Sequence, residues 1–455
     1  MAVLMVVFGV SSVVLGACFA LLKWNEIRYH SKGLPPGTMG WPIFGETTEF
    51  LRHGPDFMKN QRARYGSVFK SHILGCPTIV SMDPELNRYI LVNEAKGLVP
   101  GYPQSMVDLL GKCNVAALHG SAHKHIRSSL LSLVGPPAIK HDFLPRIDKF
   151  MRSFLSNWDA KTIDLQEKTN KIVEGELGSS CKAFKPEFDK LALGTISLPL
   201  NIPGTNYYQG LQGRKGIEKI LRQFMEERRG SKTHYNDLLD QILRNEKFKY
   251  NLSDEEIIDQ IITVLYSSYE TVSTTSMMAI KYLHDNPTVL QQLREEHSAI
   301  RRRKGAEDHI EWEDYKSMSL TRAVIFETSR LASVVNGVMR KTTKNIELNG
   351  FFIPKGWKIY VYTREINYDP NLYPKPFAFD PWRWLDKNLE NHKHCFIFGG
   401  GGRLCPGKEL GILQISIFLH YFVTRYRWEE VGKNEIVKFP RVEAPKGFHI
   451  QVSKY

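Results

Sequence analysis

Closely spaced cysteines are missing from this sequence. Its six cysteines stand at positions 18, 76, 113, 181, 395 and 405, and no two of them form a CxxC pair. A chain of 455 residues is also far longer than the small secreted domains that disulfides hold together. The spacing therefore argues against a disulfide framework, and we expect reduced thiols in a domain that faces the cytosol.

The chain also lacks internal repeats, low-complexity tracts and basic runs interleaved with aromatic residues. Its net charge is +13 and its pI is near 9.2, a balance that suits an acidic protein surface or anionic lipid head groups. No nucleic-acid partner is expected, because the basic cluster at residues 301–304 is predicted to be a solvated loop. Hydrophobic residues make up 42% of the chain, which favours a sizeable core over disorder.

Charged residues are absent from residues 2–22, which form one continuous apolar segment. As a helix this segment would span about 31 Å, close to the hydrocarbon thickness of a bilayer. A cleaved signal peptide is the alternative, but basic and aromatic residues follow directly, namely Lys23, Trp24 and Arg28. We expect residues 1–22 to be a single-pass anchor in the endoplasmic reticulum membrane, with the remaining chain in the cytosol.

Residues 23–45 are predicted to form a basic, proline-rich elbow, since their prolines cannot continue a helix. A catalytic domain then covers residues 46–455. Its clearest helix begins at the capping box Ser253–Glu256, continues to Leu283, and is apolar enough to pass through the core. Other helices are expected at 320–332 and after Gly407, and short strands at 68–73, 78–81, 346–353 and 358–362.

The most specific segment is Phe396–Gly407, in which four consecutive glycines precede Arg403 and Cys405. Glycines permit backbone conformations that other residues avoid and let the chain lie flat against a planar ligand. A cysteine just before a helix N-terminus is favoured as thiolate, the axial haem ligand that promotes O–O cleavage. One alternative, a phosphate loop, lacks its Lys-Ser/Thr pair here. The other is a zinc site, whose ligands would be His392, His394, Cys395 and Cys405.

On this segment the chain resembles the cytochrome P450 superfamily, whose signature F-x-x-G-x-R-x-C matches Phe398, Gly401, Arg403 and Cys405. The resemblance implies a mainly α fold with a small β region. It implies haem b, with Cys405 as the axial thiolate ligand of the iron and Phe398 among the cofactor-binding residues. O2 and electrons from an NADPH–cytochrome reductase are the implied co-reactants.

The resemblance extends to a buried ion network. Glu327 and Arg330 match the E-x-x-R pair of the family, and positions i and i+3 share one face of a helix. Arg383 resembles the second arginine of that network. We read the network as structural, because breaking one partner would leave a buried charge unpaired.

Cofactor contacts and catalytic residues are implied by the same resemblance. The candidates for contact with the haem propionates are His123, Arg127, Arg340 and Arg403. Glu270 and Thr271 resemble the acid-alcohol pair that relays protons during oxygen activation. A threonine in mid-helix can also bond the i−4 carbonyl and open the helix there. Ser268 stands where the family usually has glycine, and is expected to reduce the efficiency of oxygen activation.

A finer resemblance is to plant brassinosteroid C-6 oxidases, carried by residues 201–208, 210–215 and 265–267. It implies hydroxylation at C-6 of a steroid substrate, 6-deoxocastasterone, and a second oxidation to the ketone castasterone. Oxidation of another plant steroid or a diterpenoid hormone is one alternative. Peroxide rearrangement without oxygen activation is another, which the Glu270–Thr271 pair disfavours. The last is a haem-binding but catalytically impaired protein, suggested by Ser268 and by a shortened helix near Asn170.

Overall fold

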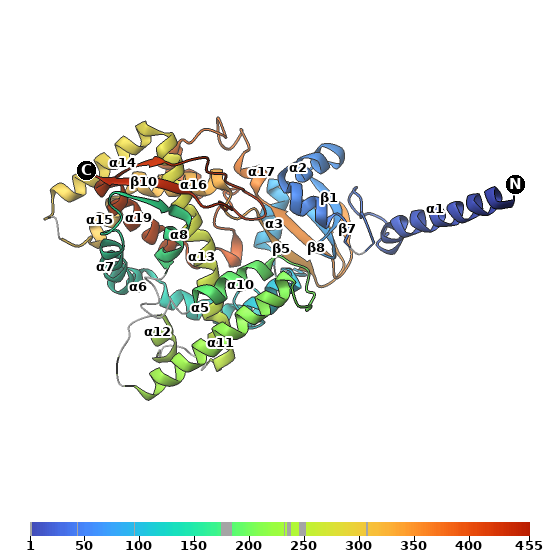
Figure 1. Ribbon diagram of the computed structural model, residues 1–455, viewed down its shortest axis with the longest axis horizontal. Helices are drawn as coiled ribbons and strands as arrows, with labels where there is room; N and C mark the ends of the chain where they lie inside the picture. Colours follow the sequence, from blue (N-terminus) through green and yellow to red (C-terminus); the bar gives the residue numbers. More distant parts are fainter. Residues whose placement is uncertain are drawn as a thin grey trace. The chain divides into compact units, whose positions relative to one another are not determined.

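The computed structural model describes residues 2–42, 44–94, 96–173, 184–231, 233, 238–244, 252–305 and 308–455. The chain forms two compact units (Figure 1). The first unit contains Met1–Pro103 and Gly337–Glu365, and the second contains Gln104–Asn336 and Ile366–Tyr455. A cytochrome P450-like, mainly helical architecture with a small β region was expected, and the second unit carries most of the helices.

The first unit is built on a five-stranded sheet of order β1-β2-β8-β5-β3. Its elements are α1 (Ala2–Arg28), α2 (Thr47–Tyr65), β1 (Val68–Ile73), β2 (Cys76–Ser81), α3 (Pro84–Val92), β3 (Leu98–Pro100), β5 (Gly337–Thr342), β6 (Ile346–Leu348), β7 (Phe351–Ile353) and β8 (Lys358–Tyr362). Strands β2 and β8 run parallel, with Val80 opposite Tyr360, and the other neighbours are antiparallel. Phe69, Val80 and Ile359 are fully buried, so the sheet supplies the core of this unit.

The predicted strand 346–353 is wrong in its middle. Asn349 and Gly350 have φ values of 52° and 77°, and they join the short strands β6 and β7 as a hairpin. Positive φ at both central residues is the geometry that an Asn-Gly turn favours. The other predicted strands match, except that β2 begins two residues earlier than expected, at Cys76.

The predicted elbow, residues 23–45, begins inside α1, which continues to Arg28, and its later part is hydrogen-bonded to the end of that helix. The amide of Met39 donates to the Glu26 carboxylate at 2.7 Å, and the Asn25 side chain donates to the Trp41 carbonyl at 2.6 Å. Among the helices of the described residues, none combines the length and the apolar character that a bilayer crossing requires.

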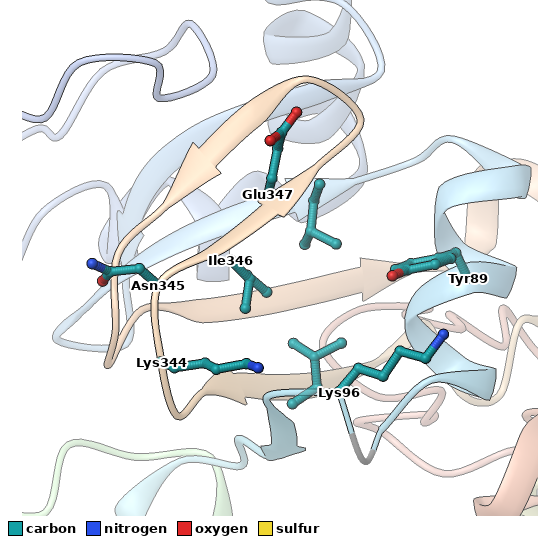
Figure 2. Close-up of a pocket in the computed structure, with 8 residues that line it drawn as sticks. Tyr89, Lys96, Lys344, Asn345, Ile346 and Glu347 are labelled. Carbon is teal, nitrogen blue, oxygen red and sulfur yellow. The ribbon is translucent and has the colours of Figure 1, made fainter.

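A surface pocket of about 280 Å³ lies in the first unit, beside the β6–β7 hairpin (Figure 2). Its lining includes Tyr89 of α3 and two lysines, Lys96 and Lys344. No residue that the sequence predicted for the functional site lines this pocket. Apart from Arg340 on β5, the predicted site residues belong to the second unit.

The second unit is a helical body with one three-stranded sheet of order β4-β10-β9. Its elements are α4 (Gln104–Leu110), α5 (Gly120–Leu133), α6 (Pro136–Ala138), η1 (Ile139–Phe143), α7 (Leu144–Phe154), β4 (Lys161–Asp164), α8 (Leu165–Asn170), η2 (Lys171–Val173), α10 (Lys185–Thr195), α11 (Asn206–Gly230), α12 (Leu238–Arg244), α13 (Asp254–Asp285), α14 (Pro287–Arg302), α15 (Trp312–Ser317), α16 (Ser319–Ala332), η4 (Pro381–Trp384), α18 (Lys387–Glu390), η5 (Gly401–Arg403), α19 (Lys408–Arg425), β9 (Tyr426–Glu430) and β10 (His449–Lys454). Helix α17 (Arg364–Asn367) spans the third sequence boundary between the units, between Glu365 and Ile366.

Helix α13 organises the second unit. It starts as predicted, because the Ser253 hydroxyl accepts from the Glu256 amide at 3.3 Å and the Glu256 carboxylate accepts from the Ser253 amide at 2.9 Å. The first half of the helix packs in a cluster with α11, where Ile261 is fully buried. Its second half packs against α16 and α19, where Ile280 and Phe418 are fully buried. The expected core helix is confirmed.

The short helix near Asn170 is six residues long and is followed by one turn of 3₁₀ helix. Its Asp164 cap accepts from the Gln166 amide at 3.0 Å. Asn170 donates to the Tyr269 hydroxyl of α13 at 3.0 Å, so this fragment still docks on the long helix. The stretch that follows, 174–183, lies outside the described residues.

Candidate haem-thiolate site

The Cys405 loop connects η5 to α19. The Cys405 amide donates to the Phe398 carbonyl at 2.9 Å, which closes the loop on itself. Gly399 and Gly401 have φ values of 80° and 63°, a region that side chains rarely adopt. A Cβ added at Gly402 would meet no atom within 4 Å. The loop therefore presents a face without side chains, which fits the flat approach of a planar group such as haem.

The Cys405 thiol is exposed on this loop. Desolvation by the surrounding protein atoms raises the pKa of the thiol, whereas the Gly407 and Lys408 amides and the Arg127 cation act in the opposite direction. Amides and cations of this kind favour the thiolate form, which is the form that ligates iron. The donor set thus fits an axial ligand.

The zinc arrangement that the sequence left open does not form. Among the described residues, the ligating side chains gathered within 4.8 Å of one another are His284, Asp285 and Glu430, and Cys405 is not with them. The Lys281 ammonium already lies 2.7 Å from Asp285 and 2.9 Å from Glu430. That acidic pair therefore has a cation of its own.

Two predicted propionate partners converge on the Cys405 loop. The Arg127 guanidinium donates to the Leu404 carbonyl at 2.6 Å, and desolvation lowers the pKa of Arg127. Arg403 donates to the carbonyls of Val115 and Ala116 at 3.1 and 3.3 Å, and also to that of Leu118. Arg127 thus supports the backbone next to the cysteine, and Arg403 links the cysteine loop to residues 115–118. The sequence indicated neither role.

The other predicted cofactor residues are distributed differently. His123 is buried on α5, one turn before Arg127. Phe398 packs its ring edge-on against Phe326 of α16, with centroids 5.3 Å apart, and so holds the loop on that helix. Arg340 is a β5 residue of the first unit, 2% exposed, with one donor on the Met339 carbonyl at 3.1 Å.

The loop whose carbonyls bind Arg403, residues 111–119, is also hydrogen-bonded to side chains of α13. Asp259 accepts from the Cys113 amide at 2.9 Å, and Gln260 accepts from the Val115 amide at 3.0 Å. Arg214 of α11 pairs with Asp259 at 2.6 Å and donates to the Leu109 carbonyl at 3.0 Å. Sequence reasoning missed this arrangement, because most of its partners are backbone groups.

The acid-alcohol pair lies in the middle of α13. The Thr271 hydroxyl donates to the Ser267 carbonyl at 2.8 Å, as predicted. The expected opening of the helix does not occur, because α13 continues through these residues without interruption. The Glu270 carboxylate accepts from Arg441 at 2.7 Å, in a pair whose side chains are each 25% exposed. Desolvation raises the pKa of Glu270, and the Arg441 charge opposes the rise. Arg441 was not predicted as a site residue.

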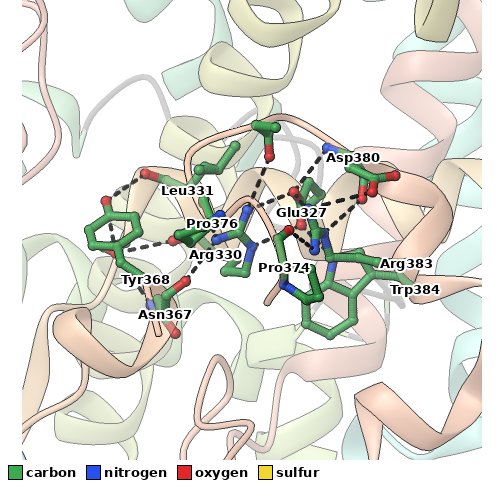
Figure 3. A network of polar contacts seen from close by, with 12 residues as sticks. Glu327, Arg330, Leu331, Asn367, Tyr368, Pro374, Pro376, Asp380, Arg383 and Trp384 are labelled. Carbon is green, nitrogen blue, oxygen red and sulfur yellow. Dashed lines mark hydrogen bonds and ion pairs between the residues drawn. The ribbon is translucent and has the colours of Figure 1, made fainter. Parts of the chain in front are cut away.

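The buried ion network forms as expected (Figure 3). Arg330 donates to both Glu327 oxygens, at 2.7 and 2.9 Å, and both side chains are completely buried. Arg383 lies 3.3 Å from Glu327, and the Trp384 indole donates to Glu327 at 2.7 Å. Arg330 also donates to the carbonyl of Asn367 at the end of α17, at 2.7 Å, and to those of Pro376 and Ala378 in the segment that follows, at 2.6 and 3.3 Å. The network therefore holds residues 367–384 against α16.

Comparison with known proteins agrees with this geometry. The cytochrome P450 family model matches residues 35–173 and 193–452. Cytochrome P450 85A1 of Solanum lycopersicum is 64% identical over 447 residues, which cover 96% of each chain. Cytochrome P450 85A of Phaseolus vulgaris is 62% identical, with all of both chains covered. A retinoic acid-bound cyanobacterial CYP120A1 structure superposes with a TM-score of 0.85 and 25% identity, covering 94% of this chain and 100% of the other.

The matched family segments contain the Cys405 loop, the Glu327–Arg330–Arg383 network and the Glu270–Thr271 pair. The fold, the exposed cysteine and the glycine-lined face of its loop agree with membership of that family. The chain belongs to the cytochrome P450 family and is a haem-thiolate monooxygenase.

Proposed function

We propose that this monooxygenase oxidises C-6 of a 6-deoxo brassinosteroid, converting 6-deoxocastasterone to castasterone through the 6-hydroxy intermediate. The observation that carries the proposal is full-length similarity to several cytochrome P450 85A proteins, at 58–64% identity. The resemblance to brassinosteroid C-6 oxidases in residues 201–208 and 210–215 supports the same substrate class. By comparison, the sequence identity to cytochrome P450 87A3 of Oryza sativa is 35%.

The proposed cofactor is haem b, with Cys405 as its axial thiolate and His123, Arg127, Arg340 and Arg403 as candidate propionate contacts. When bound, the haem supplies O2 activation and insertion of one oxygen atom into a C–H bond. The chain's own side chains contribute the proton supply for this chemistry. Glu270 exchanges protons with solvent, and the Thr271 hydroxyl passes them on.

Electrons would reach the haem from a membrane-bound NADPH–cytochrome reductase. We further propose that residues 2–22 anchor the chain in the endoplasmic reticulum membrane, with the catalytic domain in the cytosol. The uncharged run of these residues and the basic residues that follow support this placement. Alkaline extraction of microsomes should leave the full chain in the pellet and release a chain lacking residues 2–22. Release of both would contradict the anchor.

The substrate test uses microsomes that contain this chain and its reductase. With NADPH, 6-deoxocastasterone should yield the 6-hydroxy compound and then castasterone, and Cys405→Ala should abolish both products and the thiolate-type carbon monoxide spectrum. A diterpenoid hormone precursor serves as the comparison substrate. Turnover of the diterpenoid but not of the steroid, with a normal carbon monoxide spectrum, would overturn the proposal.

A second candidate is a haem-binding protein of low activity. Ser268 favours it, since this half-buried residue of α13 lies where glycine is usual. The family match also omits residues 174–192. Under this alternative, Ser268→Gly should increase steroid turnover several-fold, at a helix cost of about 0.5 kcal/mol. The neighbouring Ser267→Gly carries the same helix cost and serves as the control.

A further inference from the structure

Glu270 is held by a cation that is itself fixed to another part of the unit. One Arg441 nitrogen donates to the Glu270 carboxylate at 2.7 Å, and the other donates to the Ala192 carbonyl of α10 at 2.9 Å. The planar guanidinium is therefore oriented at both ends, and its direction toward Glu270 is set by the α10 backbone. Tyr266, one turn before Glu270, is buried and shares a contact with Thr195 of α10 at 3.0 Å.

The Thr271 hydroxyl bonds its own helix and not the Arg441 guanidinium. The hydroxyl donates to the Ser267 carbonyl at 2.8 Å. Consecutive residues of an α-helix point about 100° apart, so the two members of the pair face different neighbours. Glu270 faces the α10 and C-terminal loop side, and the transfer of a proton to Thr271 requires the carboxyl group to leave Arg441.

We propose that Arg441 is the positioning residue of the proton relay, holding Glu270 between successive proton transfers and stabilising the carboxylate that each transfer leaves behind. The proposal rests on the acid-alcohol role proposed for Glu270 and Thr271. In each transfer the Thr271 hydroxyl would give up its O–H proton to the oxygen chemistry that a bound haem would supply, and the Glu270 carboxyl proton would replace it on Thr271. The electrons of the broken Glu270 O–H bond stay on the carboxylate, which pairs with Arg441 until solvent returns a proton.

Glu270 needs a positioning cation because its carboxyl group is partly buried. A carboxylate removed from water without a countercharge is costly, so without Arg441 the neutral acid would be the preferred form and a weak proton donor. An Arg441 pair stabilises the carboxylate and keeps it in one place. Arg441 lies in the loop before β10, and its second bond, to the Ala192 carbonyl of α10, keeps the guanidinium beside Glu270.

The test measures coupling, which is steroid product formed per NADPH consumed, together with peroxide release and the solvent isotope effect on turnover. Arg441→Met should lower coupling about tenfold, the size expected for loss of one hydrogen bond to a charged group, and should raise the solvent isotope effect. Steroid affinity and the thiolate-type carbon monoxide spectrum should stay within about twofold of wild type. Arg441→Lys keeps the charge but loses the two-ended fork, and should restore part of the coupling.

The controls separate this role from a general effect. Arg229→Met removes another α13 ion pair, between Arg229 and Asp254 at 3.0 Å, and should leave coupling unchanged. Because Arg441 acts through Glu270, Arg441→Met should add no further loss in a Glu270→Gln background. Losses that multiply, or normal coupling in both Arg441 variants, would overturn the inference. If Glu270→Gln itself has normal coupling, the proposed relay fails instead.

Discussion

The Arg127 guanidinium donates to the carbonyl oxygen of Leu404, the residue directly before Cys405, at 2.6 Å. Because of this bond, α5 supports the cysteine loop independently of any contact that Arg127 makes with the cofactor. The same guanidinium also stabilises the thiolate electrostatically.

Arg127→Leu should therefore reduce haem retention and part of the thiolate-type carbon monoxide spectrum. Loss of the donor should cost the loop about 1 kcal/mol, which corresponds to a roughly fivefold change in occupancy. Arg127→Lys keeps the charge and should show the smaller effect. Pyridine haemochrome content measures the outcome, and equal haem content in all three proteins would contradict the prediction.

Glu327→Gln should be the most destabilising single substitution proposed for this chain. It leaves Arg330 buried without a countercharge, which costs about 3–5 kcal/mol out of a total stability of only about 5–15 kcal/mol. Denaturant melts and the yield of folded protein measure the loss. The control is Glu313→Gln, which breaks an exposed pair with Lys316 and should change stability by about 0.5 kcal/mol or less. Similar melts for the two variants would show that the network is not structural.

Gly111→Ala should destabilise the loop between α4 and α5, whose carbonyls accept hydrogen bonds from Arg403. Gly111 has φ +99°, and an added Cβ would lie 1.9 Å from the Asp259 carboxylate, which Arg214 and Cys113 hold in place. Strain and overpacking together should cost about 2–4 kcal/mol. Gly204→Ala is the matched control, because its φ is +91° but no atom lies within 4 Å of the new Cβ. A larger loss at Gly204 than at Gly111 would rule out the contact with Asp259 as the cause.

Stability should fall below neutral pH because of two buried histidines. His297 and His420 lie with their Nδ1 atoms 3.0 Å apart, and desolvation lowers the pKa of His297 to about 3 and the pKa of His420 well below its usual range. The unfolded chain takes up these protons near pH 6.5, so stability is complete above that pH and falls by about 1.4 kcal/mol per unit per histidine as pH drops toward the folded values.

Denaturant melts at pH values of about 7.5 and 5.5 test this slope. His297→Gln should flatten it, whereas the exposed His141→Gln should not. A wild-type protein equally stable at both values would contradict the prediction.

Local patterns predicted the fold and the cysteine loop well. The capping box at Ser253 and the Glu327–Arg330 spacing involve residues three positions apart, so the sequence alone specifies which groups meet. Arg441 could not be found this way, because 171 positions separate it from Glu270 and nothing near it marks its partner. The bonds from Arg403 to main-chain carbonyls could not be predicted either, because every residue carries a carbonyl and no sequence pattern distinguishes one from another.

The loop between α4 and α5 has a consequence for how such enzymes diversify. Asp259 and Gln260 bind its amides, and Arg403 binds its carbonyls. The side chains of Val115, Ala116 and Leu118 take no part in those bonds. Val115 and Leu118 pack against the core of the second unit, so apolar replacements should be tolerated there during divergence. Insertions or deletions would instead shift the carbonyls and loosen the cysteine loop. We therefore expect related genes to keep the length of this loop, together with Gly111 and Asn114, and to vary most at Ala116.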